Sequence, residues 1–269
     1  MNNHSPQRVS APPSHDPKTI RINKAIAQAG YCSRRKADEL VSQGRVTVNG
    51  KVVTLPGLRI APSKDVITVD GSRLPRPGSH SATYLLLYKP RGTVTTAHDP
   101  QGRKTVLDLL PKQYREQRVF PVGRLDIASE GLLVLTTDGA LTQKMTHPGY
   151  NHPKTYEVIV LGVVTQAMLG QMRQGMTLAE GERLRPVEVT ILRTTRTQTI
   201  LTMILRQGIN RQIRRMCRDL GLKVLRLKRT RQGPLCLGDL KPGAFRELTR
   251  DEVGRLKKSL QRKKTPFSR

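Results

Sequence analysis

The sequence has few of the residues that build disulfide frameworks or metal sites. Its 269 residues include three cysteines, Cys32, Cys217 and Cys236, and none of them belongs to a C-x-x-C pair. The six histidines show no H-E-x-x-H pattern. An odd number of scattered cysteines argues against both disulfides and a zinc site. We therefore expect three small buried thiols and no bound metal.

Long apolar runs and aromatic residues are also scarce. Clean apolar runs such as 132–135 are far shorter than the ~20 residues of a membrane-spanning helix. Residues 1–17 are polar and lack the apolar core of a signal peptide. With no Trp and three Phe, the chain lacks the aromatic density of an RRM-type stacking sheet. We expect a cytoplasmic protein that does not enter a membrane.

Acidic residues are heavily outnumbered in this chain. The 20 Asp and Glu residues face 48 Lys and Arg residues, which gives a formal net charge of +28 and a pI near 11.0. A self-repelling chain of this kind is expected to bind a polyanion. An anionic membrane surface is the alternative partner, but no Lys-rich amphipathic helix with an aromatic face is present. The composition therefore favours nucleic acid.

Residues 20–42 have the pattern of two short helices. Apolar residues at helical spacing end at Gly30, and Ser33 is the expected N-cap of the second helix. Three adjacent cations oppose the helix dipole there, an arrangement expected where they serve a phosphate. The alternative is a solvated run of charge. These three cations of the first turn are Arg34, Arg35 and Lys36.

A hairpin follows the two helices. Residues 46–53 alternate across the pair Asn49-Gly50, the strongest short-range signal for a two-residue turn, and a further strand is expected at 66–69. This order of helix, Cys-Ser-Arg-Arg, helix and Val-x-Val-Asn-Gly hairpin resembles the S4 RNA-binding domain. That family usually carries Glu where this chain has Lys36, so the capping box with Ser33 is lost.

The rest of the chain has a less regular pattern. Two prolines and a glycine around residues 75–81 predict a linker. Strand-like runs and helices then follow without strict alternation, which favours an α+β fold with a mixed, largely antiparallel sheet flanked by helices. The expected strands span 84–88, 132–136, 155–160, 187–192 and 199–205, and the expected helices span 164–174 and 211–220.

Three motifs in this second region carry candidate chemistry. Gly123-Arg124-Leu125-Asp126 precedes an apolar strand, Lys154-Thr155-Tyr156 opens another, and Asn210-Arg211-Gln212-Ile213-Arg214-Arg215-Met216 begins a basic helix. Taken singly, these residues have ordinary explanations. Asp126 could be a turn residue paired with Arg124, Tyr156 could fill the core, and Arg214 could contact a phosphate. A carboxylate isolated among apolar residues in so basic a chain favours a catalytic role.

The three motifs, in this order, resemble the RsuA/RluB/RluF branch of the pseudouridine synthases, which carries an S4 domain in front. The resemblance implies that Asp126 is the essential aspartate, that Tyr156 packs on the target base, and that Arg214 pairs with Asp126. It also implies that Leu205 lines the pocket. The expected RNA contacts are Arg34, Arg35, Lys36, Lys89, Arg124, Arg211 and Arg215.

The reaction implied by the resemblance turns uridine into pseudouridine without gaining or losing an atom. We therefore expect no cofactor. The carboxylate of Asp126 could add covalently to the sugar or the base, or take a sugar proton, and the motifs leave these routes open. The expected organisation is a disordered segment (1–18), an S4 domain (19–74), a linker (75–81), a catalytic domain (82–256) and a basic tail (257–269).

Sequence details within the branch point to an RNA of the ribosome. Residues 207–217 and the run Asn151-His152-x-Lys154-x-Tyr156 are most like the RluF type, whereas residues 99–106 are similar to the RluB form. We expect a monomer that modifies 23S rRNA near the peptidyl-transferase centre, free or in a preribosomal particle, with a tRNA as a further target. The alternatives are 16S rRNA and an RluB-type site in 23S rRNA.

Two other classes of function remain open at this point. S4 modules also occur in non-catalytic RNA-binding or ribosome-assembly factors, against which the intact set of Asp126, Tyr156 and Arg214 argues. A metal-dependent nuclease would need two or three carboxylates at metal-ligand spacing, and the sequence has no such group.

Overall fold

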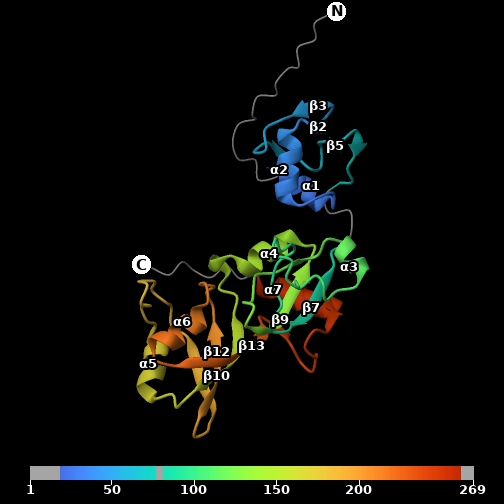
Figure 1. Cartoon of the computed structure of the whole chain (residues 1–269). Helices are drawn as coiled ribbons and strands as arrows, with labels where there is room; N and C mark the ends of the chain where they lie inside the picture. Colours follow the sequence, from blue (N-terminus) through green and yellow to red (C-terminus); the bar gives the residue numbers. More distant parts are fainter. Residues whose placement is uncertain (1–18, 77–80, 262–269) are drawn as a thin grey trace, which may run out of the picture. The chain divides into compact units, whose positions relative to one another are not determined.

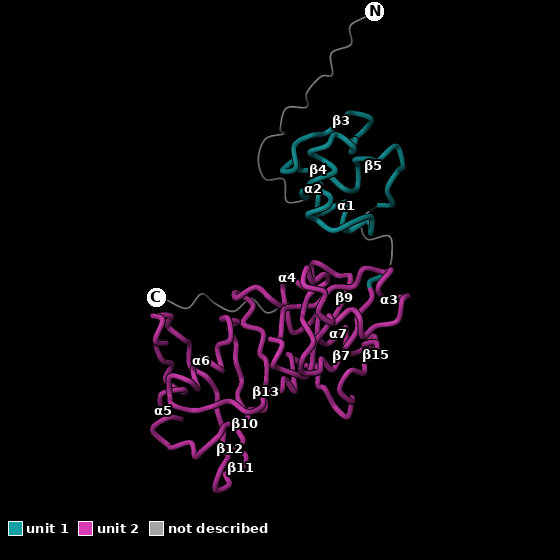
Figure 2. Tube along the Cα trace, viewed as in Figure 1, with its two compact units in different colours: residues 1–82 teal, residues 83–269 magenta. Residues whose placement is uncertain are grey.

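The chain divides into two compact units, residues 1–82 and 83–269 (Figure 2). The computed structural model describes residues 19–76 and 81–261 (Figure 1). The disorder expected for 1–18, most of the expected linker and the end of the expected tail lie outside these described residues.

The first unit packs two short helices against small antiparallel sheets. As predicted, Ser33 caps the second helix, because the backbone N–H of Lys36 donates to Ser33 Oγ at 3.2 Å. Asn49 and Gly50 both have positive φ, 51° and 79°, as a two-residue hairpin turn requires. The elements are β1 (Ile20–Arg21), α1 (Ile22–Gln28), α2 (Arg34–Ser42), β2 (Val46–Val48), β3 (Lys51–Val53), β4 (Arg59–Ile60), β5 (Ile67–Val69) and β6 (Ser72–Arg73).

The second unit is built on a nine-stranded sheet in the order β11-β12-β10-β13-β9-β7-β15, with β14 beside β13 and β8 beside β9. Among the described residues, β13 and β9 pair in parallel and the other neighbours in this sheet pair antiparallel. The predicted α+β class with a mixed, largely antiparallel sheet is confirmed. The strands are β7 (Tyr84–Lys89), β8 (Phe120–Pro121), β9 (Glu130–Thr136), β10 (Lys154–Leu161), β11 (Glu188–Thr194), β12 (Gln198–Leu205), β13 (Lys223–Gln232), β14 (Leu235–Cys236) and β15 (Phe245–Glu247).

Helices cover the faces of this sheet. Alternate residues of β10, β12 and β13, such as Val158, Leu201 and Leu227, form one apolar face that packs against α5 and α6 (Figure 1). Each such side chain stabilises the fold by roughly 1.5–3 kcal/mol when fully buried. The helices are α3 (Lys112–Glu116), α4 (Gly139–Thr146), the 3-10 turn η1 (Pro148–Tyr150), α5 (Gln166–Gln174), α6 (Gln212–Asp219) and α7 (Arg250–Ser259).

Two elements of the second unit show where the sequence-based predictions fail. Helix α7 runs across the boundary expected at residue 256, because Leu256 and Leu260 are 0% and 2% exposed and belong to the hydrophobic core. The expected tail therefore begins within a packed helix. Strand β13 was not predicted at all, since five of its ten residues are Lys or Arg. It nevertheless lies in the middle of the sheet, between β10 and β9.

Candidate active site

Asp126 lies on the loop between β8 and β9, half-buried in the wall of a cavity of about 290 Å³. The loop turns back on itself, since the N–H of Ser129 donates to the Asp126 carbonyl at 2.9 Å. It then enters β9, whose seven residues are all buried. Gly131 has φ +108°, and a Cβ there would lie 2.3 Å from the Arg229 carbonyl oxygen. This close approach of β9 to β13 requires glycine and fixes the root of the Asp126 loop.

Lys89 supports this loop from inside the protein. Its side chain is 0% exposed, and Nζ donates to the carbonyls of Ser129 at 2.8 Å and Pro90 at 3.0 Å. Burial lowers the Lys89 pKa to about 8, although the charges of Asp126 and Glu130 oppose that shift. The predicted RNA contact at Lys89 is therefore wrong, because a fully enclosed ammonium that holds two carbonyls does not reach a phosphate.

Arg214 contacts the backbone of the Asp126 loop. Its Nη2 donates to the Ala128 carbonyl at 3.0 Å and is 3.4 Å from Ser129 Oγ. Burial lowers the Arg214 pKa, and the negative charge of Asp126 acts in the opposite direction. Among the described side chains, no ion pair within 4.0 Å joins the two residues. Arg214 therefore lies near Asp126 without forming a direct salt bridge to it. Its hydrogen bonds hold the backbone of the loop that carries Asp126.

Tyr156 and Leu205 line the same cavity as Asp126. Tyr156 is half-buried on β10, opposite Met203 of β12 on one side and Arg229 of β13 on the other. Leu205 ends β12 and is buried. Residues that are far apart in the sequence therefore converge, with a carboxylate, an aromatic ring and an aliphatic wall around one space large enough for a nucleobase.

The other predicted RNA contacts have different surroundings. Arg124 and Arg211 are exposed at the wall of the cavity, and Arg211 precedes α6 in a left-handed conformation with φ 49°. Arg215 forms ion pairs with Glu180 and Glu182, and its side chain is 16% exposed. Because its charge is already compensated within the protein, the predicted phosphate contact at Arg215 is not supported. The three cations of the α2 first turn, Arg34, Arg35 and Lys36, are all exposed.

The cavity also contains polar residues that the sequence analysis had not assigned. Lys154, Arg229 and Gln232 line it, and Arg229 and Gln232 are almost completely buried. Gln212, at the start of α6, is 4% exposed, and neither its amide oxygen nor its amide nitrogen has a hydrogen-bond partner among the residues that the structure describes. Lys154 belongs to a recognised motif, but Arg229 and Gln232 lie in a basic stretch that offers no signal of burial.

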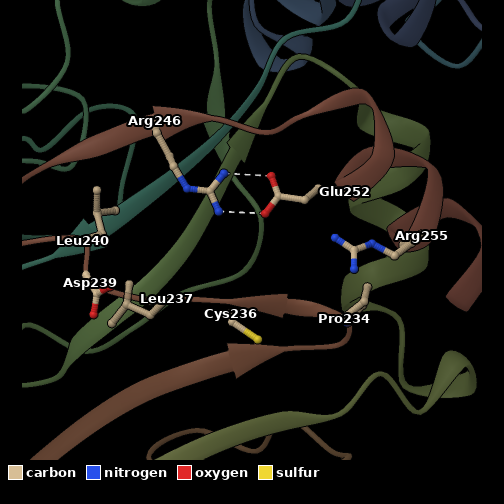
Figure 3. Close-up of a pocket in the computed structure, with 9 residues that line it drawn as sticks. Pro234, Cys236, Leu237, Asp239, Leu240, Arg246, Glu252 and Arg255 are labelled. Atoms are coloured by element: carbon tan, nitrogen blue, oxygen red, sulfur yellow. Dashed lines mark hydrogen bonds and ion pairs between the residues drawn. The ribbon is translucent and has the colours of Figure 1, made fainter.

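A second cavity, of about 350 Å³, lies beside β14 and α7 (Figure 3). Arg246 and Glu252 face each other there through two contacts of 2.7 Å. Cys236 also lines it and is exposed, contrary to the expectation that all three cysteines are buried. No residue predicted to act in catalysis or RNA binding borders this cavity, so the site is assigned to the first.

The described residues show neither the pattern of a metal site nor that of a membrane-spanning helix. Within 19–76 and 81–261, no group of three or more His, Cys, Asp and Glu side chains is arranged to hold a metal ion. In the same part of the chain, no helix combines the length and apolar character needed to cross a membrane.

Comparisons with known proteins agree with these observations. The RNA pseudouridylate synthase family model matches residues 83–219, and the S4 domain model matches residues 20–67. An uncharacterized RNA pseudouridine synthase of Aquifex aeolicus is 41% identical over 93% of this chain and 98% of its own length. The ribosomal large subunit pseudouridine synthase B of Bacillus subtilis is also 41% identical, over 92% of this chain and 99% of its own length.

A solved structure shows the same fold. A crystal structure of a pseudouridylate synthase superposes with a TM-score of 0.64 at 27% identity, covering 88% of this chain and 99% of that one. Both resemblances noted in the sequence are thereby confirmed. The chain belongs to the RNA pseudouridylate synthase family and carries an S4 domain ahead of its catalytic unit.

Proposed function

We propose that this pseudouridine synthase acts on the RNA of the large ribosomal subunit. The observation that carries this proposal is the end-to-end similarity to the Bacillus subtilis enzyme named for that subunit. That name belongs to the RluB type, so it favours the alternative over the RluF type to which the motifs pointed. The S4 unit, with its exposed cations at the start of α2, is suited to hold a structured RNA by its phosphates.

In this proposal Asp126 is the catalytic carboxylate. The reaction breaks the bond from N1 of uracil to C1′ and forms a new one from C5, so the hydrogen on C5 must leave. Asp126 stands in the cavity wall, where it can reach the sugar or base of a nucleotide that has left its stack. Tyr156 would hold the base by its ring face, and Leu205 would close the opposite wall.

Arg214 serves as the positioning residue for Asp126. Its two contacts lie on the loop segment two and three residues after Asp126, so they restrain the carboxylate without occupying it. Its positive charge also lies near the carboxylate. An unblocked carboxylate can act as a nucleophile or a base, whereas one held in a direct ion pair would first have to be released.

We also propose that the enzyme acts as a monomer in the cytoplasm. Asp126, Tyr156 and Leu205 all line a cavity within one chain, so a second copy is not needed to complete the site. The substrate is free large-subunit rRNA or an assembling particle.

Tritium release tests the proposed function. Ribosomal RNAs carrying tritium on C5 of uridine are incubated with the protein in the presence of a chelator, and the counts released to water are measured. We expect release from the large-subunit RNA and none from 16S rRNA or tRNA. Release from 16S rRNA or tRNA alone would overturn the substrate assignment, and release from no RNA would point to a binding factor. Mapping pseudouridines in cells with and without the gene then locates the uridine.

A further inference from the structure

One corner of an otherwise apolar sheet face is polar. Further along the strands this face carries Val158, Leu201 and Leu227 beneath α6. At the end of β10 where Tyr156 lies, the same face instead carries three polar residues. We call them the base floor, and they are Lys154, Arg229 and Gln232.

A β-bulge places these residues together. Lys154 is paired with Gln232, and Tyr156 is paired with Arg229, so each pair points to one face of the sheet. Arg229 and Gln232 are three residues apart, a spacing that sends side chains to opposite faces of a regular strand. The register shift between Thr155 and Tyr156 leaves one extra residue on β13 and brings both side chains to the cavity.

Each residue of the base floor has at least one polar group without a partner among the described residues. Arg229 is 2% exposed, and while Nε donates to the Leu132 carbonyl at 2.7 Å, Nη2 is buried without an acceptor. Gln232 is 1% exposed, and its Oε1 is buried without a donor. Among the described residues, no acceptor contacts the Lys154 ammonium. Burial and the nearby charge of Arg229 lower the Lys154 pKa to about 8. Buried groups of this kind are costly unless a ligand satisfies them.

The unsatisfied groups match one edge of uracil. That edge presents the carbonyl oxygens O2 and O4 as acceptors on either side of the N3–H donor. The base floor presents the opposite set, two cationic donors and one amide oxygen that accepts. Cytosine does not match, because it has an amino group in place of O4 and no hydrogen on N3. A phosphate does not match either, because it has no hydrogen to donate to Gln232 Oε1.

The same edge is unchanged by the turn that the reaction requires. Half a rotation about the line through N3 and C6 brings C5 to the place of N1. That rotation exchanges O2 with O4 and leaves N3–H where it was. A floor with a cationic donor for each carbonyl therefore binds the base equally before and after the turn. When the N1–C1′ bond breaks and the bonding pair stays on the base, the negative charge spreads over both carbonyl oxygens, next to the two cations.

We propose that Lys154, Arg229 and Gln232 recognise the O2, N3–H, O4 edge of the target uracil and hold the base through its turn. This assignment rests on the proposed function and deepens it. Tyr156 fixes the plane of the base, and the base floor fixes the base within that plane. Uridine is thereby selected over cytidine at the target position.

The test uses Gln232→Met and Lys154→Met, which keep side-chain length but remove the polar group. We expect kcat/KM for tritium release from large-subunit rRNA to fall by roughly 10- to 100-fold in each, as for removal of a hydrogen bond to a charged or buried group. Gln198→Met is the matched control, because Gln198 is exposed at the far end of the neighbouring strand β12. It should keep wild-type kcat/KM, and thermal unfolding of all three variants checks the fold.

RNA binding separates base contacts from phosphate contacts. In an Asp126→Asn background, Gln232→Met should weaken binding of RNA with uridine at the target position but not of RNA with an abasic nucleotide there. If the floor holds a phosphate, Lys154→Met in the same background also binds the abasic RNA more weakly, and its slope of log K against log salt becomes shallower by ~0.7–0.9 because a cation is lost. Wild-type kcat/KM in both floor variants would overturn the inference while leaving the function intact. A wild-type protein that releases no tritium from any rRNA refutes the function itself.

Discussion

The exposed cations of the S4 unit and the cations that line the catalytic cavity are the same residue types in different environments. The first turn of α2 presents three side chains to water, and one of them, Lys36, also pairs with Glu39 at 2.8 Å. Arg229 is instead fully buried and Lys154 is half-buried in the cavity wall, each with few partners. Exposed cations bind the phosphates of RNA whatever its base sequence. Cations that line a pocket and lack partners instead favour a ligand that carries matching acceptors. A net charge of +28 predicts the first use but says nothing about the second.

The sharpest separation of binding from chemistry is expected at Asp126. Asp126→Asn keeps size and shape but removes the negative charge, so tritium release should fall to background while RNA affinity stays within about threefold. Measuring release and affinity on the same labelled rRNA checks both halves. If Asp126→Asn releases tritium at a rate near that of the wild type, the assignment of the catalytic carboxylate is wrong.

A smaller but still large effect is expected at Arg214. Both loop contacts are made by one nitrogen at the end of the Arg214 guanidinium, and the ammonium of the shorter Lys side chain does not reach the same point. Arg214→Lys should lower turnover by roughly 100-fold with little loss of RNA affinity. Arg218→Lys is the control on the same helix, since Arg218 is ion-paired with Glu180 and Asp219. Equal losses of turnover and affinity would instead mark Arg214 as a phosphate contact.

Replacing the exposed cations of α2 should weaken RNA binding without lowering turnover. Replacing Arg34, Arg35 and Lys36 together by Ala should weaken RNA binding by roughly tenfold at moderate salt. The slope of log K against log salt should become shallower by ~0.7–0.9 for each phosphate that the variant no longer binds. Turnover at saturating RNA should stay unchanged, because none of these residues lies in the catalytic unit. An unchanged slope and affinity would show that the start of α2 does not bind RNA.

The smallest expected effect is a pH dependence of the base floor. The Lys154 pKa is lowered from 10.5 to about 8, so kcat/KM should decline as pH rises from about 7 to 9 and the ammonium loses its proton. Lys154→Met should lack this decline. A fall in kcat/KM that both proteins share comes from another titrating group, in the protein or in the RNA. A wild-type profile identical in shape to that of Lys154→Met would remove Lys154 from the floor.

The free energy of unfolding should change in the opposite direction, rising with pH above about 8. Lys154 and Lys89 both have a pKa near 8 in the folded protein and near 10.5 when exposed. Between these values the unfolded chain binds more protons, so both lysines make the free energy of unfolding rise with pH. Thermal unfolding of wild type and Lys154→Met from about pH 8 to 10 measures this, and a smaller rise is expected in the variant.

Local patterns predicted the first unit well. Ser33 as a cap and Asn49-Gly50 as a turn depend on backbone geometry within a few residues, which side-chain type determines directly. The order of the catalytic motifs likewise identified the family and the loop that carries Asp126. These signals are local in the chain or carried by short runs of residues, so they can be read without the tertiary structure.

The surroundings of the cavity could not be read in this way. Strand β13 looks like a basic surface segment, and its burial follows from its position between β10 and β9. Lys89 ends the apolar strand β7, just before a Pro-Gly loop, yet its side chain turns inward to two carbonyls. The side of the sheet on which Arg229 and Gln232 lie depends on a single bulge. These residues are buried because strands distant in sequence pack around them. The composition of their own segments therefore does not predict their burial.

The parallel pairing of β13 with β9 is short, with Lys228 opposite Glu130 and Arg229 opposite Gly131. On one side of this seam stands the loop with Asp126, and on the other side stand Tyr156 and the base floor. A slip of one residue along the seam would displace one half of the site by ~3.3 Å, far more than a reacting pair of atoms tolerates. The alignment of the two strands is set by backbone contact between Gly131 and Arg229. Side-chain replacements in the cavity can therefore change its chemistry without changing the distance between its halves.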